Sequence, residues 1–207
     1  MPGPENRVVP HFREELEQCK ARLLEMGGLA EEEVRLSIKG LVERDNALIE
    51  RVMRGDGPLN SLHIEIDNRC FTLLALHQPM AADLRTIVAA VKINTDLERV
   101  GDLAVNIAEA ARRYAQHAAV KRLIDIPQMA AIAQSMLRDS LDALKSQIFR
   151  ELLTYMLQDP ATIEPALDLI LVSRHLERIG DHATNVAEDV IFMVLAKDVR
   201  HHAAEGG

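Results

Sequence analysis

A stretch of thirteen residues occurs twice in this chain of 207 residues, and this duplication constrains the fold more than any other feature. The first copy, LERVGDLAVNIAE, spans residues 97–109, and the second copy, LERIGDHATNVAE, spans residues 176–188. Nine of the thirteen positions are identical, and two of the four differences exchange Val for Ile. Such a repeat indicates an internally duplicated architecture, in which the two halves of the chain fold alike.

The composition indicates that the repeated unit is helical. Apolar residues make up 48% of the chain, whereas aromatic residues make up 3% and Trp is absent. This profile is typical of stacked helices and not of a β-sandwich or barrel. No segment alternates apolar and polar residues over the length of a strand. We therefore predict an all-α fold of two tandem helical bundles that are related by an approximate twofold.

Turn signals divide the chain into predicted helices. We expect breaks at Gly27 and Gly28, at residues 55–58 (Gly-Asp-Gly-Pro) and at Pro79, because Gly and Pro interrupt helices most strongly. Between these breaks, apolar spacing predicts helices over residues 10–26, 30–53, 59–77, 82–115 and 164–195. The two copies of the repeat therefore fall in the fourth of these helices and in the last one.

The second half of the chain is shorter than the first. No Gly or Pro occurs between residues 128 and 158, which predicts one straight helix of about 46 Å where the first half has a hairpin. The second bundle must then lose a helix, complete itself by swapping with another copy, or reverse sharply between Asp139 and Lys145. For the straight helix we expect exposed apolar residues in a monomer, which make the chain form a homodimer or aggregate. The predicted units are a first bundle over 1–122, a second, shortened bundle over 123–200 and a disordered tail over 201–207.

Charge and hydropathy exclude several classes of protein. The net charge of −8 argues against nucleic acid as a partner, because the phosphate backbone attracts basic proteins. No apolar run approaches the roughly 18 residues of a membrane-spanning helix. The start of the chain, MPGPENR, has no apolar signal core, which argues against secretion. Cys19 and Cys70 have no CxxC spacing, so we expect reduced, structural thiols.

Each copy of the repeat carries Glu, Asp and Asn at steps of four residues, which aligns the three side chains along one side of a helix. The first ladder consists of Glu98, Asp102 and Asn106, and the second ladder consists of Glu177, Asp181 and Asn185. Two carboxylates one turn apart repel each other, and helix formation does not require them. A divalent or trivalent metal ion would replace this repulsion with coordination, because hard ions bind carboxylate and amide oxygens. We therefore expect each ladder to bind metal.

A solvated helix face is the competing interpretation of the ladders. Acidic residues number 32, so pairs four residues apart arise by chance, as with Glu164 and Asp168. On this interpretation Glu98 and Asp102 lie on a solvated face with Arg99 and Arg112 nearby. The apolar residues upstream on the ladder side are Leu84, Ile87, Val88 and Val91. The ladder therefore continues a face that we expect to be buried.

Three further residues of the repeat have structural interpretations. Gly101 and Gly180 each lie between the two carboxylates of a ladder, where Gly costs about 1 kcal/mol relative to Ala. We interpret each glycine as a notch for the close approach of a neighbouring helix. His182 follows Asp181, but its counterpart Leu103 is apolar, so we interpret His182 as a surface or interface residue and not as a ligand.

The two copies of the repeat resemble the paired signatures of the PhoU family of phosphate-uptake regulators. The segments FREELEQCKARLLEMGGLAEE and LALHQPMAADLRTI are also similar to that family, and the resemblance covers nearly the whole chain. It implies two three-helix bundles side by side with multinuclear metal clusters, and about twenty residues of the family are missing between residues 136 and 149. The residues that it implies as ligands are Glu98, Asp102, Glu177 and Asp181, with Asn106 and Asn185 as helpers.

The resemblance also implies a cytoplasmic negative regulator without catalytic activity. Such a protein holds down the phosphate ABC transporter, through its ATPase, and the phosphate-responsive sensor histidine kinase when phosphate is plentiful. The bound ion is left open among iron, zinc, manganese and magnesium.

Two other functions compete with this interpretation. A di-iron carboxylate oxidase in a helical bundle needs Glu-x-x-His on two helices, and no Glu of this chain has a His three residues later. A structural helical adaptor without metal is the second alternative. Neither a Ser/His/Asp arrangement nor a phosphate-binding Gly loop is visible, which argues against an enzyme.

Overall fold

The computed structural model describes residues 5–77, 79, 82–135, 152, 156 and 158–195. Among these residues there is no β-strand, which confirms the predicted all-α class. The elements are α1 (Glu5–Glu43), α2 (Asn46–His77), α3 (Ala82–Tyr114), α4 (Asp125–Ser135), the short 3-10 helix η1 (Pro160–Thr162) and α6 (Ile163–Leu195).

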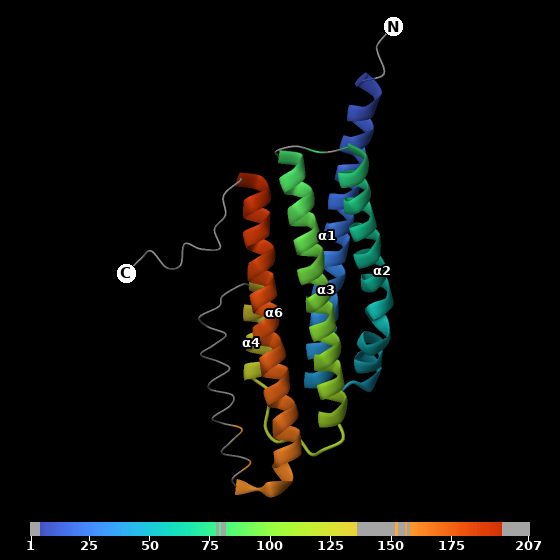
Figure 1. Cartoon of the computed structure of the whole chain (residues 1–207). Helices are drawn as coiled ribbons and strands as arrows, with labels where there is room; N and C mark the ends of the chain where they lie inside the picture. The colour runs from blue at the N-terminus through green and yellow to red at the C-terminus, as the bar shows by residue number, and fades with distance from the viewer. Residues whose placement is uncertain are drawn as a thin grey trace, which may run out of the picture.

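The first three helices form an antiparallel bundle. Helices α1 and α3 run in one direction and α2 runs in the other, and each packs on the other two (Figure 1). Their inward side chains are fully buried, as expected for helices with one apolar stripe. Examples are Met26, Ile49, Ile66, Ile87 and Ile107.

Helix α6 packs lengthwise on α3, and α4 packs on α6 and also contacts α1 (Figure 1). The contacts between α3 and α6 define an antiparallel register. Lys92 Nζ is 3.5 Å from Asp189 Oδ1 near one end, and Arg113 Nε is 2.8 Å from Asp168 Oδ1 near the other. The two copies of the repeat lie between these ion pairs, so both ladders occupy the middle of the same helix pair.

The expected break at Gly27 and Gly28 is wrong, because α1 continues through both glycines. The chain reverses instead at Arg44, whose φ of 54° lies in the left-handed region. The N–H of Asp45 donates to the carbonyl of Gly40 at 3.0 Å, which closes α1 with a Schellman-type motif. The Asp45 carboxylate then accepts the N–H of Ala47 at 2.8 Å and caps α2.

The expected turn at residues 55–58 is also wrong, because α2 continues through it with Pro58 inside the helix. Proline has no N–H, so one hydrogen bond of the helix is lost there. The next residue, Leu59, is fully buried. Tertiary packing therefore outweighs the local turn signal. The helix predicted over 30–53 is divided between the end of α1 and the start of α2, and the helix predicted over 59–77 is the rest of α2.

Several predictions fall on residues that the structure does not describe. The straight helix over 128–158 and the alternative reversal between Asp139 and Lys145 lie mostly outside the described residues, as does the tail over 201–207. The division into bundles over 1–122 and 123–200 remains a prediction.

Candidate functional site

The first ladder lies on α3, where Glu98 and Asp102 are half-buried and Asn106 is exposed. Arg99 bridges the two carboxylates: its Nε is 3.7 Å from Glu98 Oε2, and its Nη1 donates to Asp102 Oδ2 at 3.3 Å. The arginine thus offsets one of the two negative charges from the same helix. The expectation that the ladder continues a buried face is only partly correct, because Ile87 is buried but Leu84 and Val88 are about 40% exposed.

A polar cluster that the sequence analysis missed lies directly beside the first ladder. Asn94, one helical turn before Glu98, is fully buried. Its Nδ2 donates to the backbone carbonyl of His63 at 3.0 Å and to Asp67 Oδ1 at 2.9 Å, both on α2. His63 and Asp67 have the same spacing of four residues as Glu98 and Asp102, and their side chains are 3.7 Å apart. That spacing was the only signal in the sequence.

Two atoms of this cluster have unused hydrogen-bonding capacity. Asn94 Oδ1 and His63 Nδ1 are buried and find no hydrogen-bond partner among the described residues. Buried polar atoms without partners are uncommon and mark places where a water or an ion would bind. Within the described part of the chain, however, no three His, Cys, Asp or Glu side chains are close enough together to hold a metal ion. Side chains would have to rotate for the ladder and the cluster to bind one together.

Gly101 is a packing notch between the two carboxylates of the first ladder, as predicted. A Cβ atom at this position would lie 3.0 Å from Leu59 Cδ1 and 3.3 Å from Glu33 Oε2. The absence of a side chain therefore allows α2 and α1 to approach α3 at the level of the ladder. Gly180, the counterpart on α6, is buried as well.

The second ladder lies on α6, with Glu177 half-buried and both Asp181 and Asn185 exposed. Asn185 turns toward α3, since its Nδ2 donates to Asp96 Oδ1 at 3.4 Å. His182 Nδ1 lies 2.7 Å from the same oxygen. The interpretation of His182 as an interface residue is therefore confirmed.

An acidic pocket of about 410 Å³ opens where α3 and α6 meet, next to Asn185. Its carboxylates come from both helices, and Lys92 supplies the cation among its lining residues. The lining residues are Val91, Lys92, Thr95, Asp96, Asn185, Glu188 and Asp189. Asn185 is thus the ladder residue in the lining of this pocket, and the other lining residues belong to neither ladder.

Asp168, the example of a chance acidic pair with Glu164, has a structural role of its own. It is 4% exposed, and its Oδ1 accepts the Nε–H of Arg113 at 2.8 Å, which links α6 to the end of α3. Glu164 is largely exposed, with its Oε2 at 3.6 Å from His117 Nε2. The two carboxylates therefore serve separate ion pairs and do not form a third ladder.

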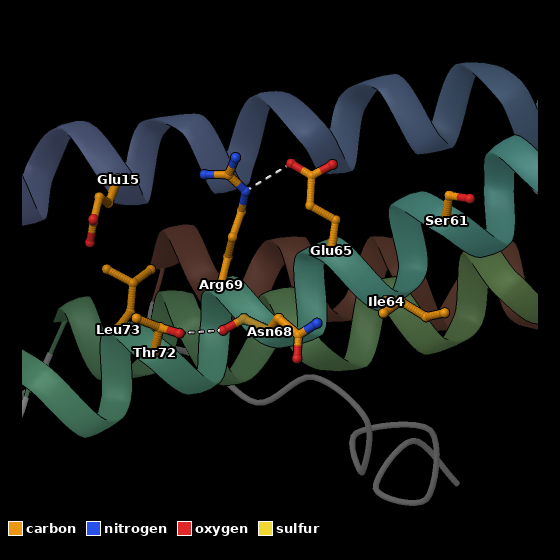
Figure 2. Close-up of a pocket in the computed structure, with 8 residues that line it drawn as sticks. All are labelled: Glu15, Ser61, Ile64, Glu65, Asn68, Arg69, Thr72 and Leu73. Atoms are coloured by element: carbon orange, nitrogen blue, oxygen red, sulfur yellow. Dashed lines mark hydrogen bonds and ion pairs between the residues drawn. The ribbon is translucent and has the colours of Figure 1, made fainter.

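A second pocket, of about 500 Å³, opens on the outer side of the first bundle between α1 and α2. Figure 2 shows Arg69 extending from α2 toward α1, and its Nε donates at 2.9 Å to Oε1 of Glu65, one turn earlier on α2. Its Nη1 also donates to Gln18 Oε1 on α1 at 3.1 Å. This pocket lies on another surface from the ladders and mixes apolar with polar side chains.

Comparisons with known proteins agree with this architecture. The family model described as PhoU domain matches residues 23–111 and 141–190. A protein of Caulobacter vibrioides, named phosphate-specific transport system accessory protein PhoU homolog, is 39% identical over 93% of each chain. A protein of the same name from Pseudomonas aeruginosa is 35% identical over 95% of this chain and 90% of that one. The chain therefore belongs to the PhoU family.

Solved structures support the same assignment at the level of the fold. The crystal structure of PhoU from Pseudomonas aeruginosa has a TM-score of 0.81 at 34% identity and covers 90% of this chain and 100% of that one. The phosphate transport system regulatory protein PhoU from Streptococcus pneumoniae has a TM-score of 0.73 at 22% identity over 91% and 99%. No helix in the described part of the chain is long and apolar enough to cross a membrane.

Proposed function

We propose that this chain is a regulatory accessory protein of phosphate uptake. In this role it holds down the phosphate ABC transporter and the phosphate-starvation response when phosphate is plentiful. The observation that carries the proposal is the match over nearly the full length to relatives that are named phosphate-specific transport system accessory proteins.

The chain acts in this proposal as a helical adaptor in the cytoplasm and not as a catalyst. Its partners are the transporter ATPase, the phosphate-responsive sensor kinase and a second copy of the chain. Exposed apolar side chains on long helices support a binding role, because such side chains are used in contacts between proteins. Ile64 and Phe71 on α2 are each 60% exposed, and Leu167 and Leu171 on α6 are 49% and 39% exposed.

Metal binding by the ladders is the second part of the proposal. Glu98 and Asp102 would hold an ion on the first ladder, with His63 and Asp67 supplying further donors from α2. Asn94 Oδ1 and His63 Nδ1 support this assignment, because neither has a hydrogen-bond partner among the described residues and oxygen and imidazole donors together suit iron, zinc or manganese. A bound ion would neutralise the carboxylates and tie α2 to α3.

The second ladder would bind its own ion through the corresponding positions on α6. Glu177 and Asp181 would be the ligands, and Asn106 and Asn185 would assist in the first and second ladder, respectively. The Asn185 amide already lies within hydrogen-bond distance of a carboxylate, which supports a role in positioning acidic groups.

An adaptor without metal is the competing function, and one observation favours it. Arg99 already pairs with both Glu98 and Asp102, so part of the negative charge of the first ladder is offset without an ion. Surface ion pairs of this kind are worth less than about 1 kcal/mol, and a cation of higher charge would displace the arginine readily.

Deletion of the gene tests the regulatory role. Alkaline phosphatase expression in phosphate-rich medium should rise in the deletion strain, because the starvation response is released. Supplying the wild-type chain should restore repression. Unchanged phosphatase expression after deletion would refute the proposed function, whether or not the protein binds metal.

A further inference from the structure

The two cysteines of the chain, 51 positions apart in the sequence, meet in the core of the first bundle. Cys19 lies on α1 and Cys70 on α2, and their Sγ atoms are 3.5 Å apart. Both are free thiols, and their side chains are 1% and 0% exposed. Their sulfur atoms need to approach by only about 1.5 Å to reach the length of a disulfide bond. The packing of two helices therefore brings together a thiol pair that the sequence spacing does not reveal.

The surroundings of the pair distinguish the two sulfur atoms. The hydrogen bond from the Cys70 thiol holds the pKa of Cys19 below its ordinary value, and the positive charge of Arg69 acts in the same direction, although burial opposes both. The same hydrogen bond and burial raise the pKa of Cys70. The positive charge of Arg69 thus favours the thiolate on Cys19, whereas the negative charge of Asp67 disfavours it on Cys70, and the thiolate is the form that reacts with oxidants.

Arg69 is next to the thiol pair and also lines a surface pocket. It precedes Cys70 on α2, and its hydrogen bond to Gln18 spans the seam beside Cys19. Its side chain lines the outer pocket of about 500 Å³, together with Leu73, one turn after Cys70 (Figure 2). The pocket therefore opens beside the thiol pair, while both sulfur atoms themselves are buried and do not line it.

We propose that Cys19 and Cys70 are a reversible oxidation site, at which a peroxide converts the thiol pair into a disulfide between α1 and α2. The Cys19 thiolate attacks one peroxide oxygen; the O–O bond breaks and hydroxide leaves, which gives a sulfenic acid on Cys19. The Cys70 sulfur then attacks the Cys19 sulfur, the S–O bond breaks and water leaves. Both sulfur atoms are oxidised, and one peroxide is reduced to two waters.

The disulfide would link α1 covalently to α2 within the first bundle. It closes a loop that contains the whole reversal at Arg44 and Asp45, and long closed loops restrict the unfolded chain strongly. Oxidation should therefore raise the melting temperature, by about 5 °C or more for a chain of this size. A thiol reductant should reverse the change. The device is independent of the proposed function in phosphate uptake.

Treatment of the folded wild-type protein with hydrogen peroxide tests the proposal. After denaturation, thiol alkylation and mass spectrometry, the oxidised protein should be about 2 Da lighter, carry no alkyl group and regain both thiols with dithiothreitol. The variants Cys19→Ala and Cys70→Ala should each show no intramolecular disulfide and no rise in melting temperature. Arg69→Gln should slow the reaction several-fold, because it removes the cation beside Cys19.

Protein unfolded in urea is the control for the oxidant itself. If the unfolded chain forms the disulfide but the folded chain keeps two alkylatable thiols, the proposal is overturned. A disulfide only between two chains, or oxidation of Cys19 to a sulfinic acid without linkage to Cys70, would also overturn it. An unchanged rate in the folded variant Arg69→Gln would contradict the assigned role of the arginine.

Discussion

The glycine between the carboxylates of the first ladder shows how a single missing side chain sets the distance between helices. In the core, Leu59 is fully buried and cannot turn away into solvent. A methyl group at position 101 would lie 3.0 and 3.1 Å from its two terminal carbons. A Cβ at Gly28, by contrast, would meet nothing within 4 Å. The two glycines therefore occupy opposite environments within helices.

Replacement of each glycine by Ala should change stability in opposite directions. Gly28→Ala should raise the free energy of unfolding by about 0.5–1 kcal/mol, because Ala favours the helix and meets no neighbour. Gly101→Ala gains the same helical preference but overpacks Leu59, so we expect a net loss of up to about 1 kcal/mol. Urea unfolding of both variants measures the difference. Equal stabilisation by the two substitutions would contradict the interpretation of Gly101 as a packing notch.

His175 gives the fold a dependence on pH. Burial lowers the pKa of its imidazole, and the charges of Arg178, Arg174 and Arg113 act in the same direction. The unfolded chain therefore binds a proton below its ordinary pKa of about 6.5, while the folded chain does not. Stability should fall as the pH decreases from about 7 to 5, because the unfolded state binds more protons there.

The variant His175→Gln tests this dependence. Its free energy of unfolding should change less between pH 7.5 and 5.5 than that of the wild type. His11→Gln is the matched control, since the His11 side chain is 68% exposed. If removal of His175 leaves the pH dependence intact, another group is responsible for it.

At the scale of elements, α6 is joined to α3 by an ion pair with one buried partner. Asp168 is nearly fully buried, and its Oδ2 has no hydrogen-bond partner among the described residues. Arg113 is half exposed and supplies the counter-charge. A buried charge that depends on a single partner is costly to disturb.

The ion pair of Asp168 should contribute more to the free energy of unfolding than the ion pair of Glu164. Arg113→Ala should destabilise the chain by about 2–4 kcal/mol, because the buried carboxylate of Asp168 loses its partner. Glu164→Ala, on the same helix but exposed, should change stability by less than about 0.5 kcal/mol. Thermal unfolding of both variants compares them directly. Comparable small effects would show that Asp168 is stabilised in another way.

The element boundaries mark the limit of what the sequence predicts. Helical periodicity and the repeat were sufficient for the all-α class, but the helix predicted over 30–53 ran through Asp45, which caps α2 in the structure. The reversal itself lies at Arg44, a residue with no preference for positive φ, so no turn signal pointed to it. Gly27 and Pro58 gave strong local signals that tertiary packing overrides, because the burial of neighbours such as Met26 and Leu59 outweighs their cost.

Only part of the candidate site could be predicted from the sequence. The ladders on α3 and α6 were visible because each is repeated. His63 and Asp67 were not, because among 32 acidic residues their spacing is unremarkable, and only the packing of α2 against Asn94 distinguishes them. Arg99 was identified as a neighbour of the ladder, but its double contact depends on side-chain conformation.

At the scale of the whole molecule, the duplication places two equivalent ladders on one antiparallel helix pair. The first ladder faces a helix with donors of its own. Most of the segment between α4 and α6 lies outside the described residues. The two ladders lie on different helices of this pair, and one separate site for each ladder remains a prediction.

Metal analysis of protein purified without chelators and without an affinity tag tests this account most directly. The tag matters because histidine tags bind metal, and His201 and His202 already add two imidazoles to the tail. We predict that wild-type protein contains bound metal, and that Glu98→Ala with Asp102→Ala removes about half of it. The pair Glu177→Ala with Asp181→Ala should remove the other half. Absence of metal from the wild type, or an unchanged content in both double variants, would contradict the account.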